Sequence, residues 1–228
     1  MIRSLILVLV LIITIFACQD HSGQTNLQKV TDFIEDSTLC ATYFVDDSSR
    51  IQGVLTVKDL NGQVVVEKTY KNDVLNGPER NYYPNGQLEG EYVLKEGLYE
   101  GPYKTYSEEG ILLSEGYYKQ NMIEGELRTY YDNGKLKEIV NMQQNMTNGP
   151  FQEFDESGFL AAEGSYVFDD EKDALEDGLL LIYEDEKLIR KMVCDTGLCC
   201  TLWTAEKGDV EPVNELCQDI IQKRMNNE

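Results

Sequence analysis

The stretch "YYPNGQLEGEY", residues Tyr82 to Tyr92, carries the signature of a β-hairpin. Its Asn85-Gly86 dipeptide is typical of a tight hairpin turn, and aromatic or apolar residues lie on both sides of it. This glycine recurs with a period of 24 residues, and a second series with the same period precedes it by nine residues. The two series are Gly53, Gly77, Gly101, Gly125 and Gly149, and Gly62, Gly86, Gly110, Gly134 and Gly158. Self-similarity at one fixed period indicates a repeat protein.

The spacing of the two glycine series predicts the fold of one repeat. Turns separated by nine and fifteen residues leave room for two strands of about six to eight residues each and for no helix. We therefore expect an all-β fold, an elongated antiparallel meander of 24-residue hairpins. In the second strand, small residues such as Gly90, Gly116 and Gly164 share a face with large side chains. In a thin sheet, this pattern predicts hollows in which aromatic rings lie.

A stripe of cations and tyrosines is the candidate binding site on the first strand of each repeat. A cation stands two residues before a tyrosine in three repeats, so each pair shares a face of its strand. The stripe consists of Arg80, Tyr82, Lys104, Tyr106, Arg128 and Tyr130. It predicts a positive ladder that suits an acidic or extended partner. The alternative is that the cations only neutralise neighbouring glutamates across the strands. The recurring glutamates Glu67, Glu91, Glu115 and Glu163 are expected to form a solvated or cross-strand-paired face.

The segments "YYPNGQLEGEYV" and "EGPYKTYSEEGILLSEGYYKQNMIEGELRTYYDNGKLKE" resemble the MORN repeat variant of exported bacterial repeat proteins, which often carry the label YwqK-like antitoxin. The resemblance covers roughly residues 53–183. It implies an array of MORN-like β-hairpins used as a scaffold for proteins or lipids. The antitoxin label implies an alternative role, an immunity-like protein that neutralises a partner toxin.

The N-terminus reads as an export signal. Arg3 precedes an apolar run of about a dozen residues, shorter than the roughly 20 that a membrane-spanning helix needs. The quartet from Ile15 to Cys18 resembles the lipobox of bacterial lipoproteins, which implies that Cys18 is lipidated, with palmitate among its acyl chains, and becomes the first mature residue. The expected location is the bacterial cell envelope, as a membrane-anchored lipoprotein that is periplasmic or surface-exposed. The alternative is an uncleaved anchor that a cysteine merely follows.

The charge of the chain excludes one class of partner. The formal net charge is −21, and removal of the leader takes away one positive charge and no negative charge, which leaves −22. A protein that binds nucleic acid neutralises phosphates with Lys and Arg, so this acidity argues against nucleic acid as a partner. It also argues against electrostatic adhesion to anionic lipid, so the membrane would be reached through the lipid anchor alone.

The residues that most catalytic and metal sites need are missing from the expected fold. The only histidine is His21, which falls in a polar tether, and this argues against Ser-His-Asp, Cys-His and histidine-metal sites. We therefore expect no catalytic residues, no metal and no cofactor. The acidic insertion at residues 169–177 lacks the glycine-centred spacing of an EF-hand loop, so a solvated loop is favoured over a calcium site. The predicted function is non-catalytic protein–protein binding or scaffolding with an unknown protein partner, and an envelope glycan or cation binder is a further alternative.

Both flanks of the array look like caps. The expected divisions are a lipoprotein signal peptide at residues 1–17, a tether at 18–26, an N-terminal cap at 27–52, the array at 53–193 and a C-terminal cap at 194–228. The first cap is expected to hold a short helix at residues 27–34 and a strand at 39–45, and the second a helix at about 212–224.

The last cap also contains four cysteines, and an exported protein favours their oxidation. Adjacent cysteines seldom bond each other, so we expect Cys199 and Cys200 to form disulfides with Cys194 and Cys217, in one order or the other. Cys40 is then left as a thiol in an apolar strand.

Overall fold

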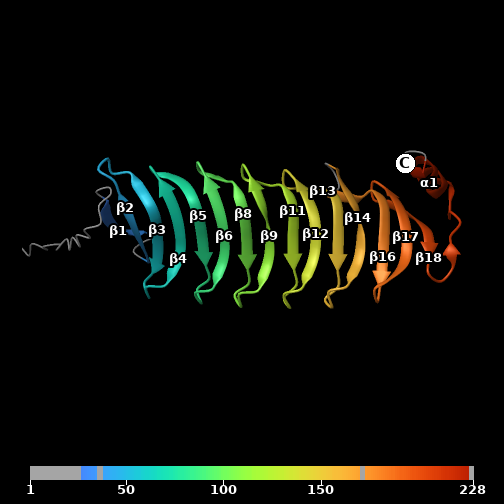
Figure 1. Ribbon diagram of the computed structural model, residues 1–228, viewed down its shortest axis with the longest axis horizontal. Coiled ribbons are helices and arrows are strands. Elements are labelled where there is room, and N and C mark those ends of the chain that lie inside the picture. Colours follow the sequence, from blue (N-terminus) through green and yellow to red (C-terminus); the bar gives the residue numbers. More distant parts are fainter. Residues whose placement is uncertain (1–26, 35–37, 170–172, 226–228) are drawn as a thin grey trace, which may run out of the picture.

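A computed structural model describes residues 27–34, 38–169 and 173–225 of the chain. The predicted signal peptide, the tether, Cys18 and His21 lie outside the described residues. Consecutive strands pair side by side into one elongated sheet, and the strands run across its long axis (Figure 1). Every pairing recorded between these strands is antiparallel, which confirms the predicted all-β meander.

The described part of the chain contains 19 strands and one helix. The first strands are β1 Gln28–Ile34, β2 Leu39–Val45, β3 Ile51–Asp59, β4 Val64–Lys71, β5 Val74–Tyr82 and β6 Leu88–Lys95. The central ones are β7 Leu98–Tyr99, β8 Gly101–Tyr106, β9 Leu112–Lys119, β10 Met122–Ile123, β11 Gly125–Tyr130 and β12 Leu136–Gln143. The last are β13 Met146–Phe154, β14 Leu160–Asp169, β15 Asp173–Glu176, β16 Gly178–Glu184, β17 Lys187–Asp195, β18 Leu198–Thr204 and β19 Gly208–Asp209, followed by helix α1 Glu215–Met225.

The glycines of the Gly86 series lie in turns, as predicted. The amide of Gly86 donates to the carbonyl of Tyr83 at 2.9 Å, and the amide of Tyr83 donates to the carbonyl of Gln87 at 2.9 Å. Gly86 has a φ of +87°, a left-handed backbone conformation that costs glycine little and other residues more. The side chains of this edge also join neighbouring hairpins, because the Tyr83 hydroxyl donates to the carbonyl of Tyr106 at 2.8 Å.

The glycines of the Gly77 series do not lie in hairpin turns, so this part of the prediction is wrong. Gly77 lies inside β5, and the pairing of β4 with β5 shifts register between Lys68 and Tyr70, which indicates a β-bulge. Its φ is +135°, and a Cβ there would come within 2.8 Å of the Thr69 side chain. Glycine recurs at this position because the backbone has a positive φ in all five repeats, and at Gly77 a neighbouring side chain also packs against the backbone.

The second turn of each repeat is a two-residue turn that the glycine pattern did not reveal. Both turn residues have positive φ, as in a type I′ turn, for example 52° at Gln120 and 68° at Asn121. Asn121 also links its turn to the preceding hairpin. Its amide donates to the carbonyl of Tyr99 at 3.0 Å, and its side-chain oxygen accepts a hydrogen bond from the Tyr99 amide at 2.7 Å. Asn145 binds Ile123 in the same way, at 3.1 and 2.6 Å.

The two caps differ in how well they were predicted. Residues 28–34 form β1, so the predicted helix at residues 27–34 is wrong. The whole of β1 pairs with β2, and this pairing supplies backbone hydrogen bonds that a helix of about eight residues would form only marginally in water. The strand at residues 39–45 and the C-terminal helix are confirmed. Asn214 caps α1, since its side chain accepts a hydrogen bond from the amide of Cys217 at 2.9 Å.

One face of the sheet, here called the core face, buries its side chains against the sheet itself. Its centre is a cluster of Val140, Met142, Phe151 and Ala162. The Phe151 ring lies over Gly164, at 3.0 Å from the place a Cβ would occupy. The same arrangement places Tyr103 over Gly116, also at 3.0 Å, and Tyr92 over Gly90 at 2.8 Å. The predicted hollows for aromatic rings are therefore confirmed at these three glycines.

Candidate functional site

The predicted stripe lies on the other face of the sheet, here called the open face. Strand register places Arg80, Lys104 and Arg128 in one row that crosses the strands, with a glutamate between each cation and the next. The row runs Glu67, Arg80, Glu91, Lys104, Glu115 and Arg128, each directly opposite the one before it. We call these six residues the charged row.

Ion pairs join the members of the charged row. Arg80 lies 3.9 Å from both Glu67 and Glu91, and Lys104 lies 3.0 Å from Glu115. Arg128 lies 3.9 Å from Glu115, and it also binds Glu126 at 2.6 Å. Because the signs alternate, the prediction of a positive ladder is wrong, and the structure agrees with the alternative of neutralisation across strands.

The tyrosines of the stripe donate hydrogen bonds to the glutamates of the charged row. The hydroxyl of Tyr82 donates to Glu67 at 3.0 Å, and the hydroxyl of Tyr130 donates to Glu115 at 2.7 Å. Tyr106 makes the equivalent, longer bond to Glu91 at 3.4 Å. Burial and the hydrogen bond to Glu115 raise the pKa of Tyr130 to about 12. Hydrogen bonds from Tyr130 and Lys104 lower the pKa of Glu115 below its ordinary value.

The charged row should be weakened by acid. Because the pKa of Glu115 is lower in the folded chain than its ordinary value of 4.5, folding favours the ionised carboxylate. The stabilisation is complete above pH 4.5 and is lost as the pH falls through the lowered pKa. Urea unfolding should therefore show that Glu115→Gln destabilises the chain at pH 7 and has a smaller effect at pH 3.

The matched control is Glu156→Gln, which changes an exposed glutamate in a turn. This variant should unfold like the original chain at both pH values. An effect of Glu115→Gln that stayed constant between pH 7 and pH 3 would contradict the role assigned to the ionised carboxylate.

A hollow of about 510 Å³ lies on the open face just beyond the charged row. Across the strands the row continues from Arg128 to Ile139, Gln152, Glu163 and Leu181. The hollow is lined by Glu126, Ile139, Val140, Asn141, Pro150, Phe151, Gln152, Glu163, Gly164, Ser165, Leu179 and Leu181. We call it the open-face hollow.

Sequence reasoning missed the open-face hollow, although a signal was present. Ile139 occupies the place at which the other repeats have Glu67, Glu91, Glu115 and Glu163. One strand further on, Gln152 replaces the cation that three of the earlier repeats carry as Arg80, Lys104 and Arg128. These two departures from the repeat are directly opposite each other in the sheet, which makes the row apolar and uncharged at this point.

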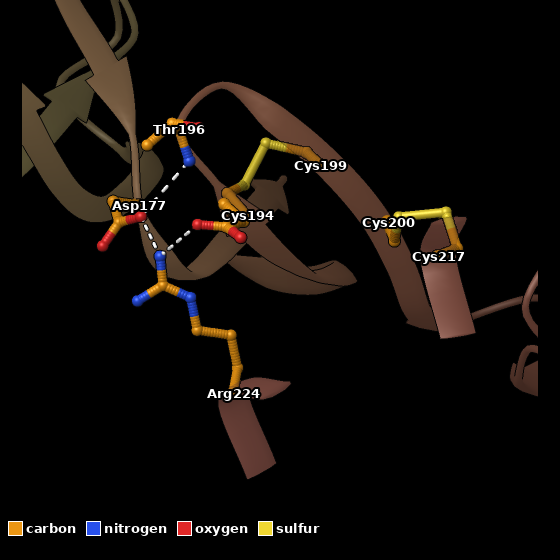
Figure 2. Close-up of a disulfide and its surroundings, with 8 residues drawn as sticks. Asp177, Cys194, Thr196, Cys199, Cys200, Cys217 and Arg224 are labelled. Atoms are coloured by element: carbon orange, nitrogen blue, oxygen red, sulfur yellow. Dashed lines mark hydrogen bonds and ion pairs between the residues drawn. A yellow bond between two sulfur atoms is a disulfide. The ribbon is translucent and has the colours of Figure 1, made fainter. Parts of the chain in front are cut away.

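The four cysteines of the C-terminal cap form two disulfides, as expected (Figure 2). Cys194 is bonded to Cys199, which lies directly opposite it on the neighbouring strand. Cys200 is bonded to Cys217 of α1. Successive side chains of a strand point to opposite faces, so Cys199 and Cys200 reach different partners. Among the described cysteines Cys40 is free, and its side chain is half-buried.

Apolar packing and an ion-pair group hold α1 against the end of the sheet. Ile220 packs in a cluster with Val193 and the second disulfide. Near the end of the helix, the guanidinium of Arg224 binds the carboxylates of Asp177 and Asp195, and Asp177 also accepts a hydrogen bond from the Thr196 amide at 3.2 Å (Figure 2). The helix is thus bound to the junction between β15 and β16 and to the end of β17.

Two further features concern only the part of the chain that the structure describes. No group of three or more His, Cys, Asp or Glu side chains there is arranged to hold a metal ion. Within the same residues, no helix has both the length and the apolar composition that a membrane crossing requires.

Comparison with known proteins agrees with the hairpin architecture. No curated protein matches the chain. Four consecutive segments, residues 51–72, 75–96, 99–120 and 123–144, match the family model for the MORN repeat variant. Each gap between them begins at the second residue of a two-residue turn, such as Asn121, so each segment contains the two long strands of one hairpin. The central hairpins of the sheet are therefore similar to the MORN repeat variant, and this similarity suggests a repeat-based binding or scaffold role.

Proposed function

We propose that the chain is an exported, lipid-anchored and non-catalytic scaffold of the bacterial cell envelope, which binds a protein partner on its open face. The observation that carries this proposal is the open face itself. It presents the charged row and the open-face hollow side by side on one continuous sheet. The similarity to MORN repeats and the resemblance of the N-terminus to a lipoprotein leader support the same proposal.

Exposed apolar side chains on the open face favour a protein partner. Val54, Tyr117 and Leu179 lie on the same face as the charged row and are 47%, 45% and 52% exposed. These side chains lie on β3, β9 and β16, so each would give one separate apolar contact to a partner that extends along the sheet, among the polar groups of the open face. The core face offers less accessible surface, because its own rings cover it.

The partner is identified by capture from native envelopes. The full chain, carrying a photo-crosslinking residue in place of Tyr117, should trap one predominant protein under light. The same crosslinker in place of exposed Leu60, in a turn outside the open face, provides the matched control. Failure to trap any envelope protein at Tyr117 would contradict the proposal. A trapped toxin, encoded beside this chain, would identify the immunity function instead.

The proposed lipid anchor predicts a large effect of one substitution. Cys18→Ala removes the thiol that would be acylated, so labelled palmitate should no longer be incorporated and the leader should remain uncleaved. Labelling of growing cells, followed by immunoprecipitation, measures both results. Cys40→Ala is the matched control and should keep the label. Equal incorporation into the Cys18→Ala chain would contradict lipidation at this residue.

A further inference from the structure

The open-face hollow lies where several departures from the repeat coincide. Three of the five repeats have proline at one open-face position, as Pro78, Pro102 and Pro150, whereas the first repeat has Val54 there and the fourth has Glu126. Ile139 replaces a glutamate and Gln152 replaces a cation. All three substituted residues line the hollow. The other hairpins show that the sheet forms with the ordinary residues at these places, so the hairpin fold alone does not require the substitutions.

The size and lining of the open-face hollow fit a side chain of a partner. Its volume of about 510 Å³ falls within the ~300–1,000 Å³ of typical ligand-binding clefts. Ile139 contributes apolar surface on one side, and Leu179 and Leu181 of β16 contribute it on the other. Leu179 is 52% exposed, so burial beneath a partner would remove a large apolar surface from water.

Unlike the glutamates of the charged row, Glu163 in the open-face hollow has no cation beside it among the described residues. Glu163 accepts hydrogen bonds from two neutral donors, the side-chain amide of Gln152 at 3.2 Å and the hydroxyl of Tyr183 at 2.7 Å. Among the described residues Glu163 makes no ion pair, whereas Glu115 makes two. Lys191, further along the same row, lies over the ring of Trp203 with its Nζ 5.7 Å from the ring centroid. The hollow thus combines apolar walls with one carboxylate that lacks a cation.

We propose that the open-face hollow is the docking site for a segment of the partner protein that inserts an aliphatic or aromatic side chain and places a Lys or Arg beside it. The apolar side chain covers Ile139, Leu179 and Leu181, and the cation binds Glu163. A charge-assisted hydrogen bond to a half-buried carboxylate is stronger than the neutral bonds that Glu163 now accepts. The net charge of −21 also favours the approach of a basic segment.

This inference rests on the proposed protein-binding function and specifies its partner. The open-face hollow recognises a basic side chain next to an apolar one, whereas the charged row serves to stabilise the sheet. A segment without an apolar side chain leaves the walls uncovered, and an acidic segment meets Glu163 with a like charge.

The test uses the full chain and a library of random 12-residue peptides displayed on phage. Selection on the immobilised chain should enrich peptides in which Lys or Arg lies next to Leu, Ile, Met, Phe or Trp. The double variant Ile139→Glu with Gln152→Lys restores the charges of the other repeats. It places charged groups on the walls of the hollow and supplies a cation for Glu163, so it should weaken the enriched peptides by about tenfold or more.

A matched double variant changes the charged row and leaves the hollow intact. Glu91→Ile with Lys104→Gln makes the same kind of exchange at residues that do not line the hollow. Peptide affinity should stay within about twofold of the original chain. Circular dichroism and melting confirm that both variants remain folded. Leu179→Lys is a second variant for the case that Ile139→Glu with Gln152→Lys fails to fold, because Leu179 is exposed. A lysine at residue 179 should weaken the basic peptides by repulsion.

The outcomes separate this inference from the proposed function. Enriched peptides that lack the basic and apolar pair, or that bind the hollow variants and the original chain equally, overturn the docking site. A library that yields no enriched peptide overturns it as well. The scaffold function is contradicted separately, by the absence of any crosslinked envelope protein at Tyr117.

Discussion

Replacement of Phe151 by alanine should lower the free energy of unfolding by about 3–5 kcal/mol, the largest effect expected of a single substitution in this chain. Phe151 is only 3% exposed and lies at the centre of the core-face cluster. Its ring stacks on Tyr166 with centroids 4.1 Å apart and covers Gly164. In a sheet whose rings cover their own backbone, removal of the ring exposes Gly164 and leaves a cavity that neighbouring side chains fill poorly.

Urea unfolding followed by circular dichroism measures this loss. Phe159→Ala is the matched control, because Phe159 is 43% exposed and follows a turn. The control should change the free energy of unfolding by less than about 1 kcal/mol. Similar losses for the two variants would show that the core face is not what stabilises these hairpins.

Removal of the Cys200–Cys217 disulfide should lower the free energy of unfolding by about 3 kcal/mol, the second large effect. The bond closes a loop between residues 17 positions apart and joins α1 to β18. Without it, the helix would be held by the Val193 and Ile220 contacts and by the ion pairs of Arg224. The double variant Cys200→Ala with Cys217→Ala should therefore release α1 before the sheet unfolds.

The other disulfide provides the control for this effect. Cys194 and Cys199 are only five positions apart and directly opposite each other in a hairpin. Loop closure predicts a loss about 1 kcal/mol smaller for Cys194→Ala with Cys199→Ala. Hydrogen exchange should show faster exchange of the α1 amides in the Cys200 and Cys217 variant alone. Unchanged protection of α1 in that variant would contradict the role of the bond as a helix tether.

The sequence predicts hairpins well wherever glycine itself marks the geometry. The Gly86 series correctly predicts the turns on one edge of the sheet, and Gly116 and Gly164 correctly predict where aromatic rings lie. The turns on the other edge were missed because Gln120-Asn121 contains no glycine, although asparagine adopts a left-handed backbone more readily than most residues. The Gly77 series was misread because a bulge needs the same positive φ as a turn.

Other predictions were wrong because a local sequence pattern does not show which residues lie opposite it in the sheet. Residues 27–34 are too few to separate a short helix from a strand, and the pairing of β1 with β2 decides between them. The stripe of Arg80, Lys104 and Arg128 was placed correctly on one face, but its charge depends on which residues lie opposite. Strand register supplies Glu91 and Glu115 at those places. The same register brings together Ile139 and Gln152, whose departures from the repeat were visible in the sequence but not connected.

The hydrogen bonds between successive hairpins have a mechanical consequence. The strands run across the long axis (Figure 1), so the hydrogen bonds that join them lie along it. This holds for the backbone and for the edge turns, where Asn121 binds Tyr99. A tensile force on the two ends would load these bonds one strand pair at a time, as in unzipping, and would not shear many at once. Each 24-residue hairpin that opens would release up to roughly 80 Å of chain. Under tension, the array would therefore lengthen in similar steps, whereas the disulfide between β17 and β18 would keep that hairpin closed.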